Sequence, residues 1–92
     1  MDRVEEIRSR LQQALTPESL DIVDDSHKHV GHAGARGGGG HFSVTIVAEG
    51  FTGRSMVERH RMIYAAVRDL MPAEIHALAI RALTPVESLP QG

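Results

Sequence analysis

Histidine is the residue type whose number and placement most suggest chemistry in this sequence. The chain holds six histidines and no cysteine, and four of the histidines fall in the segment DDSHKHVGHAGARGGGGHF, residues 24–42. A neutral imidazole is the commonest side-chain ligand of transition metals. The same segment contains six of the nine glycines, a density that disfavours both helix and strand. We therefore expect a flexible loop over residues 27–40 that carries metal-binding side chains.

Composition limits the classes of protein to which the chain can belong. Without cysteine it has no disulfide bond, thiolate ligand or thiol nucleophile. The formal net charge of −2 gives no global attraction to nucleic acid, and no 18-residue apolar run predicts a transmembrane helix. No Ser/His/Asp set or carboxylate pair has a spacing that suggests catalysis. We expect one cytoplasmic, non-enzymatic domain over residues 1–92, with no membrane association.

The first half of the chain predicts a helix followed by a β-hairpin. Apolar residues at helical spacing indicate a helix over residues 2–15, ended by Thr16 and Pro17. The stretch SLDIVDDS predicts a short strand, and HFSVTIVA alternates cleanly between apolar and polar residues. The predicted core face of this second strand consists of Phe42, Val44, Ile46 and Ala48. The histidine- and glycine-rich loop would join the two strands in antiparallel orientation.

The second half predicts a helix, a strand and a final helical turn. Ser55 and Glu58 form a capping-box signature that opens a helix to about residue 71. EIHALAIRAL predicts a buried strand over residues 75–83, and the spacing Thr84, Pro85, Glu87 predicts a last turn of helix. The predicted buried stripe of the long helix is Met56, His60, Ile63, Val67 and Leu70, and the predicted inner face of the strand is His76, Leu78 and Ile80.

The resulting order is αββαβα, which predicts an α+β fold. A strand, helix and strand in succession form a right-handed crossover, so the last two strands should run parallel. We expect a three-stranded mixed sheet with the helices packed on one face.

Five blocks in this order resemble the BolA family along nearly the whole chain: DDSHKH, HFSVTIV, FTG, VERHRMIYAAV and EIHALAIRALTP. The most specific pieces are Arg59-His60-Arg61 in the helix and His76-Ala77-Leu78 at the start of the last strand. The resemblance implies a fold akin to type II KH nucleic-acid-binding domains. It also implies a monomer that forms a heterodimer with a monothiol glutaredoxin, bridged by a [2Fe-2S] cluster.

The resemblance also implies the ligands of this cluster. The family's loop offers one histidine or cysteine, and by position after Asp-Ser that residue is His29, with His27 and His32 near enough to substitute. His76 would be a second ligand, fixed on a strand. Because a cluster needs four ligands and this chain has no thiolate, a partner cysteine and glutathione would supply the sulfur ligands, and the chain alone would hold no cluster. The alternatives are a hydrogen-bonded histidine at a strand end and a solvated connecting loop.

The other candidate residues allow both structural and functional interpretations. His41 should lie on the surface and His60 should pack against the core. Arg54, Arg61 and Arg68 recur every seven residues and share a helix face, which is either solvated or a docking surface for an acidic partner, glutathione or phosphate.

The sequence thus supports two functions. The first is an adaptor that shares a cluster with a glutaredoxin, and the alternative is a KH-like nucleic-acid-binding transcriptional regulator that uses the arginines. The stretch GFTG matches the G-x-x-G clamp of KH domains, but it follows a strand instead of joining two helices. Three aromatic residues are also too few for a platform on which bases stack.

Overall fold

The computed structural model describes residues 2–26 and 40–90. Its elements follow the predicted order up to the last strand: α1 (Arg3–Leu15), β1 (Ser19–Asp24), β2 (Gly40–Val47), the 3₁₀ turn η3 (Glu49–Phe51), α2 (Met56–Ala66), the 3₁₀ turn η4 (Arg68–Leu70) and β3 (Ile75–Leu83). No helix among the described residues is long and apolar enough to cross a bilayer. Except for Gly40, the loop predicted at residues 27–40 lies outside the described residues.

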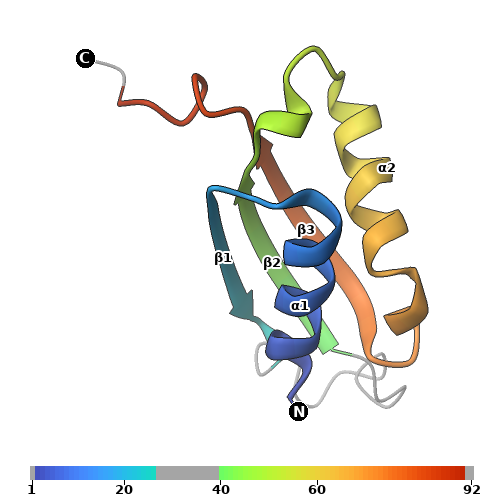
Figure 1. Ribbon diagram of the computed structural model, residues 1–92. Helices are drawn as coiled ribbons and strands as arrows, with labels where there is room; N and C mark the ends of the chain where they lie inside the picture. The colour runs from blue at the N-terminus through green and yellow to red at the C-terminus, as the bar shows by residue number, and fades with distance from the viewer. Residues whose placement is uncertain (1, 27–39, 91–92) are drawn as a thin grey trace.

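The three strands form one mixed sheet in the order β1-β2-β3. β1 pairs antiparallel with β2, and β2 pairs parallel with β3. Both helices lie on the same side of this sheet (Figure 1). The predicted α+β class, with a three-stranded mixed sheet and helices on one face, is therefore confirmed.

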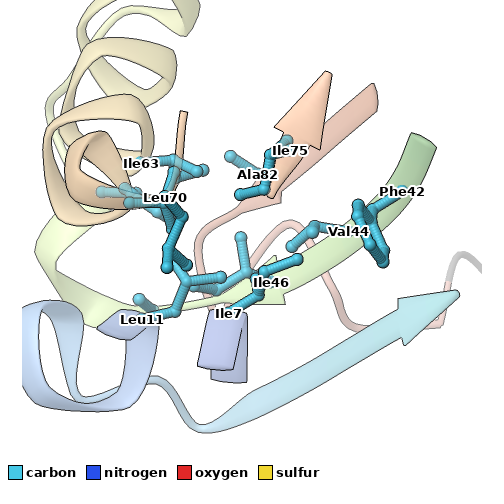
Figure 2. Close-up of a cluster of buried hydrophobic side chains, with 12 residues drawn as sticks. Ile7, Leu11, Phe42, Val44, Ile46, Ile63, Leu70, Ile75 and Ala82 are labelled. Atoms are coloured by element: carbon cyan, nitrogen blue, oxygen red, sulfur yellow. The ribbon is translucent and has the colours of Figure 1, made fainter. Parts of the chain in front are cut away.

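The core lies between the sheet and the two helices (Figure 2). The predicted core face of β2 is confirmed, because its side chains and Ala48 are almost fully buried. Asp2 caps the start of α1, since its carboxylate accepts a hydrogen bond from the N–H of Glu5, and Thr16 caps the end of the helix, where the sequence predicts that it stops. Fully buried residues from the other elements pack against β2. They are Ile7 and Leu11 of α1, Ile63 of α2, Val67 at the C-cap of α2, and Ile75 of β3.

The predicted buried stripe of the second helix is partly wrong. The α-helix ends at Ala66 and continues as a 3₁₀ turn, so it is shorter than predicted. Met56 is 52% exposed, whereas Arg59 is only 6% exposed. A pattern of apolar residues cannot identify Arg59 as buried, because its burial depends on hydrogen-bond partners from distant parts of the chain.

Arg59 joins the start of α2 to the segment that follows β3. Its guanidinium donates to the carbonyl oxygens of Arg54 at 3.0 Å and Ala82 at 3.1 Å, and to the Glu87 carboxylate at 2.6 Å and 3.2 Å. The carboxylate also accepts from the N–H of Thr84, and the Thr84 hydroxyl accepts from the N–H of Glu87. The last turn of helix predicted from Thr84, Pro85 and Glu87 is present as a single capped turn held by the buried arginine, with the N–H of Ser88 donating to the carbonyl of Thr84 at 3.1 Å, but it is not a helix of its own.

A bulge where β2 and β3 begin corrects the predicted face of β3. Gly40 pairs with Ile75, but the next residue of β2, His41, pairs with Ala77, so His76 is an additional residue in β3. An added residue reverses the side-chain alternation, so His76 does not share the face of Leu78 as predicted. The N–H of Gly40 donates to the carbonyl of Glu74 at 3.0 Å. Gly40 therefore belongs to β2 and not to the loop.

Gly40→Ala should destabilise the protein. A Cβ atom at residue 40 would lie 2.6 Å from a ring carbon of the buried Phe42 and 2.9 Å from the Ser26 hydroxyl oxygen. Relieving this overlap must move the Phe42 ring or the strand, which costs about 1–3 kcal/mol in free energy of unfolding. Urea denaturation of Gly40→Ala measures this loss. Gly50→Ala is the matched control, since a Cβ there meets nothing within 4 Å. Equal stability of the two variants would contradict the prediction.

Ionised Glu87 should make the free energy of unfolding fall as the pH is lowered in the acid range. Hydrogen bonds from Arg59 and from the Thr84 backbone lower the pKa of Glu87 from 4.5 to about 2. A carboxyl group with a lowered folded-state pKa stabilises the fold above its unfolded-state pKa. This contribution should be lost as pH falls from about 4.5 to about 2.

The measurement is urea denaturation between pH 2.5 and pH 6, with Glu87→Gln flattening the acid dependence. Some dependence should remain, because hydrogen bonds lower the pKa values of Glu58 and Asp69 as well. Glu18→Gln is the control, since the exposed Glu18 side chain makes no ion pair among the described residues. A Glu87→Gln profile that parallels the wild type would show that the Arg59–Glu87 pair does not control stability.

Candidate metal-binding site and arginine face

The structure places the imidazole rings of His41 and His76 side by side. Their ring centroids are 5.2 Å apart and their planes are inclined by 41°. His41 alternates with the buried Phe42, so its ring lies on the face of the sheet opposite the helices, and the bulge brings His76 beside it. His76 is exposed and His41 is half-buried. The sequence predicts His76 as a ligand and His41 only as a surface residue, because their proximity depends on the register between two strands.

The turn after β1 fixes the backbone of His41 on both sides. The N–H of His41 donates to the Ser26 hydroxyl at 3.0 Å, and its carbonyl accepts from the N–H of Asp25 at 2.7 Å. The N–H of Ser26 in turn donates to the Asp24 carboxylate at 2.9 Å. Residues at the end of β1 therefore hold in place the first residues of β2, from which the His41 ring projects.

A shallow depression of about 270 Å³ lies beside the His41 ring. Two residues that line the depression are hydrogen-bonded to each other: the Ser43 hydroxyl donates to the Asp25 carboxylate at 2.5 Å. Two of the other lining residues are Ala77 and Ala79, whose short side chains leave space on this face of the sheet. The His41 imidazole thus borders an open depression with both polar and apolar lining residues, which a metal ion or a partner side chain can enter.

This arrangement supplies part of a metal site. Among residues 2–26 and 40–90, no group of three or more His, Cys, Asp or Glu side chains is placed to hold a metal ion. Two imidazoles on one face can contribute two nitrogen ligands, and the remaining ligands must come from elsewhere. The donor set therefore fits a metal centre that is completed by another molecule or by another part of the chain.

The loop histidines predicted as ligands, His27, His29 and His32, lie outside the described residues. The described residues on either side of these loop histidines are Ser26 and Gly40. The Ser26 hydroxyl accepts a hydrogen bond from the N–H of His41, and Gly40 directly precedes His41. The segment is thus attached on both sides next to the site. His60 is half-buried on α2, as a packing residue would be.

The predicted arginine face divides into two parts. Arg54 precedes α2 and lies 3.7 Å from Glu58, the residue that completes the cap of the helix. Arg61 and Arg68 instead line a shallow groove of about 560 Å³ together with Tyr64, Ala65 and Met71. Of the three predicted arginines, only Arg61 and Arg68 therefore line one groove.

Comparison with known proteins identifies relatives over most of the chain. The family described as BolA-like protein matches residues 11–87. SufE-like protein 1 (chloroplastic/mitochondrial) of Arabidopsis thaliana is 43% identical over 86 residues, which cover 88% of this chain and 23% of that protein. The DNA-binding transcriptional regulator BolA of Escherichia coli (strain K12) is 38% identical over 80 residues, which cover 87% of this chain and 73% of that protein. The solved structure of BolA1 from Arabidopsis thaliana matches with a TM-score of 0.82 and 37% identity, over 97% of this chain and 99% of that one.

The chain also spans 56–58% of the length of the plant and mammalian BolA1 relatives. The family match includes β2, α2 and β3 and thus the blocks in which the resemblance was noted. The α+β fold with two helices and a three-stranded mixed sheet agrees with the solved structure. The chain belongs to the BolA-like protein family.

Proposed function

We propose that this chain is an adaptor that pairs with a monothiol glutaredoxin and contributes histidine ligands to a [2Fe-2S] cluster shared with that partner. The observation that supports this proposal most directly is the pair of imidazoles, His41 and His76, 5.2 Å apart on the uncovered face of the sheet. Membership of the BolA-like protein family supports the proposal, because the glutaredoxin partnership is what the resemblance to that family implies.

The donor set explains why the cluster would be shared. A [2Fe-2S] cluster takes four ligands, which are thiolates or, at one iron, two imidazoles. This chain has no cysteine, so it can supply only the imidazoles. A cysteine of the glutaredoxin and the thiol of glutathione would supply the sulfur ligands. When bound, the cluster supplies one-electron redox chemistry, and ligation by imidazole raises its reduction potential.

His76 is the proposed fixed ligand, because β3 holds its backbone and its side chain is exposed. The second ligand is either a loop histidine, with His29 favoured by its position, or His41. The structure adds His41 to this choice. The torsion that orients a histidine ring is broad, so two rings at this separation can turn their nitrogens toward one metal.

His76→Ala should leave the fold intact and change the visible circular dichroism of the cluster in the mixed complex, because one imidazole ligand is gone. The measurement uses this chain mixed with a cluster-loaded monothiol glutaredoxin and glutathione. His29→Ala and His41→Ala in the same assay identify the second ligand. His60→Ala is the control, since it should change stability but not the cluster spectrum. A His76→Ala complex with the wild-type spectrum would remove His76 from the site.

A second candidate function is nucleic-acid binding, as the KH-like resemblance implies. Two observations favour it: a relative from Escherichia coli is named a DNA-binding transcriptional regulator, and Arg61 and Arg68 line one groove. The charge and aromatic content are against it. The net charge is −2, and both phenylalanines are buried, which leaves Tyr64 as the exposed aromatic side chain. Cluster sharing is therefore the preferred proposal.

If the chain binds DNA through this face, the affinity for a short duplex should fall steeply with salt. Each phosphate contact that is lost should reduce the slope of log K against log[salt] by about 1, so Arg61→Ala and Arg68→Ala should each have this effect. Fluorescence anisotropy between 50 and 200 mM salt measures the slope, with Arg54→Ala for comparison. Absence of binding at the lowest salt concentration would exclude this function for the isolated chain.

A further inference from the structure

The groove on α2 has the composition of a docking surface. Arg61, Tyr64 and Ala65 stand at positions i, i+3 and i+4 and so share one face of α2, and Arg68 of the following 3₁₀ turn and Met71 line the same groove. Tyr64 is 38% exposed and Met71 is half-buried. This set of five residues, called here the helix groove, combines an apolar centre with a guanidinium group on either side.

The two arginines of the helix groove have no carboxylate partner among the described residues. The acidic side chains nearest in sequence are engaged elsewhere: Asp69 with Arg10 at 2.9 Å, Glu74 with Arg3 at 2.8 Å, and Glu58 with the cap of α2. All twelve acidic residues of the sequence fall within the described ranges. The groove therefore presents two uncompensated positive charges on a chain whose net charge is negative.

Tyr64 gives the groove a fixed wall. Its hydroxyl donates to the carbonyl oxygen of Leu78 at 3.3 Å. Leu78 belongs to β3, which is an edge strand of the sheet, so this hydrogen bond ties the outer face of the helix to the sheet edge. A ring held at its hydroxyl end presents an apolar surface at little cost in conformational entropy on binding.

We propose that the helix groove docks an amphipathic helix of a protein partner that carries acidic residues two turns apart with apolar residues between them. Arg61 of α2 and Arg68 of the following 3₁₀ turn line the same groove as Tyr64 and Ala65. Carboxylates at i and i+7 of a partner helix, about 10 Å apart along its axis, can each pair with one arginine, and apolar side chains at i+3 and i+4 can meet Tyr64 and Ala65. Charge complementarity thus defines the partner.

The shape of the groove favours a helix over other occupants. Small-molecule sites are concave and enclose most of their ligand, whereas this groove is shallow and runs along the outside of a helix. Nucleic acid needs stacking surfaces or a row of cations, and the groove offers one aromatic ring and two arginines. An amphipathic helix with acidic residues needs cationic side chains beside an apolar surface, and the groove provides both.

The helix groove and the histidine pair are separate sites carried by neighbouring elements. The C-terminal end of α2 and the start of β3 lie at the same end of the molecule (Figure 1), where the N–H of Glu74 donates to the carbonyl of Leu70 at 2.8 Å. The histidine pair nevertheless lies on the face of the sheet opposite the helices, whereas the groove lies on the outside of α2. The inference goes beyond the proposed function, since docking requires no cluster.

The test uses two synthetic helical peptides and the full chain labelled with ¹⁵N. One peptide carries Glu at positions i and i+7 with Leu at i+3 and i+4, and the other carries Lys in place of Glu. Titration with the Glu peptide should shift the amide resonances of Tyr64 and Ala65. The double variant R61E/R68E should bind the Glu peptide at least tenfold more weakly and should bind the Lys peptide instead. Arg81→Glu, which changes an exposed arginine on β3, should keep the wild-type affinity within twofold.

Several outcomes would overturn the proposal. These are no shift at millimolar peptide, shifts that map outside the helix groove, or equal affinity of wild type and R61E/R68E for the Glu peptide. If the charge reversal prevents folding, R61Q/R68Q replaces it, and an unchanged affinity of that variant overturns the proposal too. An eight-nucleotide single strand that displaces the peptide at a lower concentration than the peptide itself would assign the groove to nucleic acid. Suberate binding as tightly as the peptide would assign it to a small dianion.

Discussion

The pairing of the central strand β2 with both of its neighbours is the constraint on which the rest of the structure depends. β2 is antiparallel to β1 along six residue pairs and parallel to β3 along nearly its whole length. Its inner face supplies Phe42, Val44 and Ile46, against which both helices pack. Its outer face begins with His41. A shift of one residue in this strand would exchange the two faces, moving the core side chains into solvent and the imidazole into the core.

The histidine pair follows from an irregularity in that pairing. In a regular ladder His76 would share the inner face with the apolar residues of β3, where an imidazole has no partner. The bulge adds His76 as an extra residue of β3 opposite the start of β2. At that point Gly40 has no side chain, which leaves room for the Phe42 ring and the Ser26 hydroxyl next to its Cα. Bulges commonly redirect a side chain near a functional site. Here the bulge brings together two nitrogen donors that are 35 residues apart in sequence, in a chain that has no cysteine thiolate of its own.

Arg59 and Arg61 show how a helix assigns opposite roles to similar residues. They are two positions apart, so their side chains leave the helix on different faces. Arg59 enters the interior, where two carbonyl oxygens and the Glu87 carboxylate satisfy it, and it fixes the segment after β3. Arg61 faces outward with no acidic partner among the described residues and lines the helix groove. Burial of a charged group is tolerable only when such partners are present.

The sequence by itself determined the elements and the family. Alternation in HFSVTIVA, the capping box at Ser55 and the stop at Thr16-Pro17 are local signals, and each depends on residues only a few positions apart, so it can be recognised without the fold. The same holds for the blocks that resemble the BolA family, and for His76 as a candidate ligand. Tertiary structure decided which of these residues meet. The bulge at His76, its contact with His41 and the burial of Arg59 all depend on strand register or on hydrogen bonds between distant segments. Such contacts leave no periodic signal in the sequence, because each is set by how whole elements pack against one another.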